Sequence, residues 1–139
     1  MSDASEEVSL LQQSKRRILG HMREHEKEPT AVVDLAWLAE NMISEAGALI
    51  KIEKRLIKLL QNESFRDWER AIRRRDFVAV YKVPKAMEWI HYAEMSLIQT
   101  MLFGYDPGKE LRAEAFRQRT KFMAKAVEYI ELAVSELVE

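Results

Sequence analysis

Two histidines spaced one helical turn apart are the first residues in the chain whose pattern suggests chemistry. His21 and His25 flank Glu24 in the string HMREH, so on a helix both imidazoles share a face and the carboxylate stands ready as a base. A zinc site of this kind needs a further carboxylate ligand, and the segment around the string is mostly polar. We therefore interpret both histidines as solvated or as facing nucleic acid.

Glu88 and His91 form a second pattern, E-x-x-H, which metal-binding helical bundles use. A di-iron site of that type needs two such elements and two more glutamates, and the chain has one element. Glu53 and Glu94 are glutamates that can face the interior of a bundle. We keep a bundle metal site with iron or manganese as an alternative, but we interpret His91 as a bundle-edge residue beside Trp89. The sequence predicts no enzyme, no metal and no cofactor.

Clusters of basic residues suggest a third kind of chemistry, the binding of phosphate groups. Arginine pairs with phosphate through two parallel hydrogen bonds, and lysines spaced by three and four residues line one side of a helix. A run of charge is otherwise an ordinary solvated face. Because no helix-turn-helix, zinc-finger or aromatic RNA-binding motif is present, we expect contact with the nucleic-acid backbone alone. The candidate residues are Lys15, Arg16, Arg17, Arg23, Lys51, Lys54, Lys58, Arg73, Arg74 and Arg75.

The composition is that of one folded domain. The chain has 139 residues, of which 47% are hydrophobic and 32% charged, with four glycines, three prolines and no cysteine. The few glycines and prolines favour long helices with short connections, and the missing thiols exclude disulfides and thiolate metal sites. The acidic, polar start predicts no signal peptide, and no apolar run reaches the roughly 20 residues that a membrane-spanning helix needs.

Charge is unevenly distributed along the chain. The net charge is −1, yet residues 51–85 hold eleven basic and five acidic residues, a net charge of +6. Residues 1–28 hold five basic and six acidic residues, a net charge of −1. A neutral total therefore conceals a basic segment that can attract an anionic partner.

The apolar pattern changes at Pro29. Before it, the spacing predicts a mostly polar helix over residues 5–27 with a narrow apolar stripe. After it, four segments have apolar faces wide enough for a bundle interior. These helices are predicted from Thr30 to Gln61, from Ser64 with Asp67 in a capping box, from Pro84, and from an Asp106 cap towards Val138. The predicted fold is all-α, a four-helix bundle (29–139) behind an N-terminal helical arm (1–28).

Spacings of seven residues support the bundle. Residues 35, 42, 49 and 56 form one stripe of the second helix, and a second stripe, which includes Ile43, Ile50 and Ile57, widens the face predicted to be internal. The last helix repeats apolar residues in the same way. Those residues are Phe116, Met123, Ile130 and Leu137.

The sequence predicts a polar helical arm with Lys15, Arg16, Arg17 and Arg23, a break at Pro29 and four helices behind it. In this architecture and in its size the chain resembles one known family. It is the α-helical major capsid proteins of rod-shaped and filamentous DNA viruses of hyperthermophilic archaea. The resemblance implies a structural protein whose paired arms wrap double-stranded DNA, hold it in the A-form and build a helical virion.

We therefore expect a structural protein that binds itself or a homologous subunit, first as a dimer and then as a filament. Its second partner would be the backbone of double-stranded DNA, bound without sequence specificity, and it would have no small-molecule substrate. The resemblance implies a location in the virion, with the cytoplasm as the alternative. The alternative function is a small all-helical subunit of a nucleoprotein complex, or a protein–protein adaptor.

Overall fold

The computed structural model describes residues 4–27, 32–102 and 112–138, and its secondary structure there is entirely helical. The predicted all-α class is therefore confirmed. Five helices occur in these ranges: α1 (Ser5–Lys27), α2 (Val32–Asn62), α3 (Phe65–Arg73), α4 (Phe77–Leu102) and α5 (Arg112–Val138). None of them is long and apolar enough to cross a membrane.

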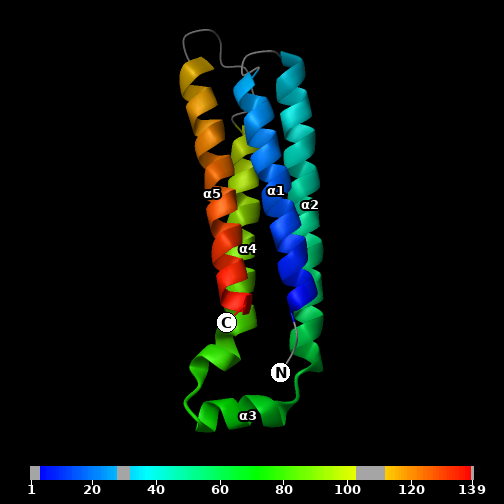
Figure 1. Cartoon of the computed structure of the whole chain (residues 1–139), viewed down its shortest axis with the longest axis vertical. Helices are drawn as coiled ribbons and strands as arrows, with labels where there is room; N and C mark the ends of the chain where they lie inside the picture. Colours follow the sequence, from blue (N-terminus) through cyan, green and yellow to red (C-terminus); the bar gives the residue numbers. More distant parts are fainter. Residues whose placement is uncertain (1–3, 28–31, 103–111, 139) are drawn as a thin grey trace.

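Four long helices form an up-and-down bundle (Figure 1). α1 and α4 run one way, and α2 and α5 run the other way. Each helix packs against two antiparallel neighbours: α1 and α4 each contact both α2 and α5. The short helix α3 lies across one end of the bundle, between the end of α2 and the start of α4. The predicted four-helix bundle is confirmed, with a different set of helices.

The first helix belongs to this bundle, whereas the sequence predicted that it would stand apart as an arm. Leu11 and Ile18 of α1 are fully buried, and with Ala4 and His25 they form a buried stripe repeating every seven residues. The apolar residues alone made this face look narrow because some of its buried positions are polar. The predicted boundary between residues 1–28 and 29–139 thus separates two helices of one bundle, and α3, which buries no residue, is its end piece.

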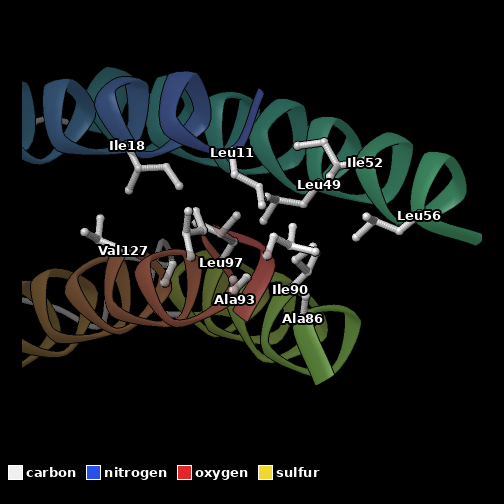
Figure 2. Close-up of a cluster of buried hydrophobic side chains, with 14 of the residues drawn as sticks. Leu11, Ile18, Leu49, Ile52, Leu56, Ala86, Ile90, Ala93, Leu97 and Val127 are labelled. Carbon is white, nitrogen blue, oxygen red and sulfur yellow. The ribbon is translucent and has the colours of Figure 1, made fainter. Parts of the chain in front are cut away.

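The core lies along the axis between the α1–α2 and α4–α5 pairs. Figure 2 shows Leu11 and Leu49 pointing from the first pair towards Ile90 and Leu97 of the second. The predicted stripes of α2 and α5 are buried at Met42, Leu49, Leu56, Met123, Ile130 and Leu137. Burying one such side chain contributes about 1.5–3 kcal/mol to stability. These layers therefore hold the helices together, and the helices in turn position the polar groups at their seams.

The ends of the helices follow the local sequence signals in two cases and depart from them in one. α1 has its predicted bounds, and Ser64 caps α3 by accepting a hydrogen bond from the Asp67 N–H, with the reciprocal bond also present. α4 begins at Phe77, earlier than predicted, and Pro84 lies inside it. Proline removes one helical N–H bond, and α4 bends near its lower end, where it leaves the bundle towards α3 (Figure 1). The predicted signals at Pro29, Thr30 and Asp106 lie outside the described residues.

Candidate functional site

The basic residues of α1 do not form a free phosphate-binding strip. The Nε of Arg17 donates to Oε1 of Glu45 on α2 at 2.7 Å, and the Ser14 hydroxyl donates to the other oxygen of the same carboxylate at 3.0 Å. Lys15 is half-buried, while Arg16 and Arg23 are exposed. Arg17 therefore holds α1 against α2, and Arg16 and Arg23 remain exposed to any external partner.

Glu45 is an anchor for the α1–α2 seam. Its side chain is buried, which by itself would raise its pKa, but hydrogen bonds from His21, Arg17 and Ser14 lower the pKa of Glu45 below its usual value. The His21 ring also meets the ring of Trp37 edge-on, with centroids 5.8 Å apart. His21 thus lies in a packed seam, and His25 is buried against the Phe116 ring of α5. The prediction that both histidines are solvated or face nucleic acid is therefore wrong.

The lysines of α2 lie on the surface of the bundle. Lys51, Lys54 and Lys58 are exposed, and none of them forms an ion pair with another described residue. Arg55, which lies among them, reaches Glu6 and Glu7 of α1 at 2.6 and 3.3 Å. The outer surface of α2 therefore presents three lysines that are free to meet an anion.

The arginines at the C-terminal end of α3 lie at the end of the bundle. Arg73, Arg74 and Arg75 are all exposed, Arg73 pairs with Glu69 one turn earlier, and Arg74 caps the helix. Arg75 adopts a left-handed backbone with φ 57°, as the turn out of the helix requires. The ten predicted basic residues are thus divided among α1, the outer face of α2 and the α3 end, and Arg17 is withdrawn by its ion pair.

A stripe of isoleucines on α2 is exposed, contrary to the prediction that it faces the interior. Ile43, Ile50 and Ile57 are 59%, 43% and 40% exposed. They lie beyond the edge of the core because the helix is covered on one side by α1 and on the other by α4, which leaves its outer arc open. Exposed apolar residues also occur on α4 at Met95, Ile98 and Leu102.

Three possible metal ligands meet where α2 packs against α4. One ligand atom each of Glu53, His91 and Glu94 lies within 4.8 Å of the others. Burial raises the pKa of Glu94 to about 8, and the neighbouring Glu53 carboxyl adds to the effect. The sequence indicated that Glu53 and Glu94 can face the interior of the bundle. It did not indicate that His91 and Glu94, three residues apart on one helix, would form a pair.

Of the predicted E-x-x-H element, only His91 belongs to this cluster. Glu88 is exposed and accepts hydrogen bonds from Lys85 at 3.1 Å and from the Tyr92 hydroxyl at 3.4 Å. His91 instead points towards Glu94, with Nδ1 3.7 Å from Oε2. Its helical partner is therefore the residue three positions later rather than three positions earlier.

Comparisons of the chain with protein-family models, with curated proteins and with solved structures gave no match. The functional argument therefore depends on the geometry of the residues themselves.

Proposed function

We propose that the protein is a self-assembling structural protein that holds the backbone of double-stranded DNA without sequence specificity. The observation that carries this proposal is that α2 presents two unpartnered stripes outward, one apolar and one basic. The apolar stripe is Ile43, Ile50 and Ile57, and the basic stripe is Lys51, Lys54 and Lys58. A helical filament around DNA, as in a virion, is the assembly that we propose.

The apolar stripe supports self-association. Residues spaced by seven share one side of a helix and pack as knobs into the holes of a second helix. A row of partly exposed isoleucines on a free monomer forfeits part of the roughly 1.5–3 kcal/mol that full burial of each side chain gives. A second copy laid along α2 would recover it, and Met95 and Ile98 of α4 would widen the contact.

The basic stripe supports backbone binding. Each lysine that neutralises a phosphate releases a condensed counterion, so affinity falls steeply with salt, with a slope of about 0.9 per contact. Lys51, Lys54 and Lys58 are the first candidates because none has an acidic partner among the described residues. Arg16, Arg23, Arg73, Arg74 and Arg75 are the second group, since they are exposed but lie on other elements. Arg17 is not proposed as a contact because it is bound to Glu45, and Lys15 is not proposed because it is half-buried.

Charge reversal on matched residues tests the DNA contact. In the double variant Lys54→Glu with Lys58→Glu, we expect loss of nuclease protection of double-stranded DNA and of salt-dependent binding. The control is Lys121→Glu with Lys125→Glu, because these exposed lysines of α5 have the same spacing of four. Equal DNA binding by both double variants would remove the α2 lysines from the proposal.

Electron microscopy tests the assembly. We expect filaments from the native protein with DNA, and discrete particles from Ile50→Gln with Ile57→Gln. The control is Leu132→Gln, an apolar residue of α5 with comparable exposure. A native protein that binds no DNA and forms no filament would favour the alternative function, a small subunit of a nucleoprotein complex or a protein–protein adaptor.

A further inference from the structure

We propose that Glu53, His91 and Glu94 form a binding site for one divalent transition-metal ion at the seam between α2 and α4. This goes beyond the structural role proposed above and does not depend on it. The ligand atoms come from two antiparallel helices and lie within 4.8 Å of one another. That separation requires only small side-chain adjustments to bring three ligands onto one ion.

A second observation, independent of the clustering, points to a missing cation. Glu94 is 8% exposed, and its Oε1 is buried with no hydrogen-bond donor in the described part of the chain. The Oε1 of Glu53 is in the same condition. Two adjacent carboxylates that each have one buried, unpartnered oxygen are costly unless a proton or a cation lies between them.

The surroundings of another buried glutamate show what this site lacks. Glu45 is 3% exposed, and Ser14 and Arg17 direct donors at its two oxygens. The carboxyl of Glu94 instead faces a second carboxyl and an imidazole, all of which are metal ligands in their deprotonated forms.

The types of ligand define the class of ion. One imidazole nitrogen and two carboxylates suit Zn²⁺, Mn²⁺ or Fe²⁺, whereas Ca²⁺ and Mg²⁺ favour sites made of oxygen alone. Glu94 lies on the buried side of the cluster and His91 on the exposed side. Three protein ligands leave room for water on the solvent side. Because the described residues contain one such cluster, the expected stoichiometry is one ion per chain. This conclusion departs from the metal-free protein that the sequence predicted, because that prediction paired His91 with Glu88.

Titration of the chelator-treated, full-length protein with Zn²⁺ tests the proposal. We expect one bound ion per chain in calorimetry, and a visible spectrum of bound Co²⁺ that shows a nitrogen ligand. His91→Ala and Glu94→Gln should each weaken Zn²⁺ binding at least ~10-fold. Glu94→Gln keeps the size of the side chain and leaves a neutral group in place of the carboxyl, so it is expected to fold, which circular dichroism checks.

The matched control is Glu88→Gln. Glu88 lies on the same helix, three residues before His91, as Glu94 lies three residues after it, but it is exposed and bound to Lys85. Unchanged Zn²⁺ affinity in this variant supports the assigned ligand set. The proposal is overturned if the native protein binds no Zn²⁺, if His91→Ala and Glu94→Gln bind as the native protein does, or if Glu88→Gln is weakened as much as they are.

Discussion

Two buried glutamates have pKa values that are shifted in opposite directions. Glu45 lies on α2 and faces α1, whereas Glu94 lies on α4 and faces α2. Glu45, at the seam with α1, has its pKa lowered by His21, Arg17 and Ser14 in spite of burial. Glu94, at the seam between α4 and α2, has its pKa raised to about 8 by burial and by Glu53. The comparison shows that, because burial raises the pKa of both carboxyls, the neighbouring groups decide the direction of the net shift.

The two seams therefore have different physical roles. The α1–α2 seam is complete at Glu45, because the buried charge there is matched by donors and ties the first helix to the bundle. The α2–α4 seam is incomplete, because carboxyl oxygens there have no donor among the described residues. Perturbed acidity without a compensating partner is more typical of a functional site than of a structural ion pair.

The largest expected effect is a pH dependence that distinguishes the two carboxyls. In the metal-free protein, folded Glu94 keeps a proton from its ordinary pKa of 4.5 up to about 8, while the unfolded chain has lost it. Stability should therefore fall as pH rises through that window, by at most about 1.4 kcal/mol per pH unit. Urea denaturation at a series of pH values measures this decline.

The matching variant for this experiment is Glu94→Gln, which should flatten the curve between pH 4.5 and 8. Glu45 has the opposite sign: its folded pKa is lowered, so its contribution is present above pH 4.5 and is lost as pH falls below that value. A decline of stability with rising pH that persists in Glu94→Gln would show that the raised pKa of Glu94 is not its cause. Excess Zn²⁺ should also reverse the decline, because the metal competes with the proton.

The second largest effect is expected from a substitution of Glu45, in the seam between α1 and α2. Glu45→Ala removes the acceptor of Ser14, Arg17 and His21 and should cost about 3 kcal/mol of unfolding free energy, because the buried Ser14 hydroxyl and the two less buried donors lose their shared partner. Urea denaturation at pH 7 measures this loss. Glu53→Ala at the incomplete seam is the contrast, and it should leave the metal-free protein as stable or more stable. Equal losses in the two variants would contradict the distinction between the seams.

Sequence reasoning reached the helices and most of the core, because these depend on local spacing. The seven-residue repeat of Met123, Ile130 and Leu137 is buried as predicted, and the Ser64 capping box is present. Both are local signals that no distant contact overrides. The assignment of α1 failed because its buried face contains polar residues that distant helices satisfy, as Glu45 satisfies Ser14.

The site was harder to predict for the same reason. Lys51, Lys54 and Lys58 share a face by spacing alone, so their exposure was predictable. The meeting of Glu53 with His91 and Glu94 depends on which helices are neighbours and on their register, and neither is written in any local pattern. Without that register, Glu88 and Glu94 were equivalent candidates on either side of His91.

The smallest expected effect concerns Glu7, a third buried glutamate that combines features of the two seams. One of its oxygens accepts a hydrogen bond from Arg55 at 3.3 Å, while Oε2 is buried without a hydrogen-bond partner in the described residues. Glu7→Gln keeps an acceptor for Arg55 and loses a single ion pair with a partly exposed arginine, so the cost should be about 0.5–1 kcal/mol. The same urea experiment measures it. Because half of this carboxyl is satisfied, its loss should lie between those of Glu45→Ala and Glu53→Ala. A loss of stability as large as that of Glu45→Ala would mean that one charged partner stabilises a buried glutamate as much as the three donors around Glu45 do.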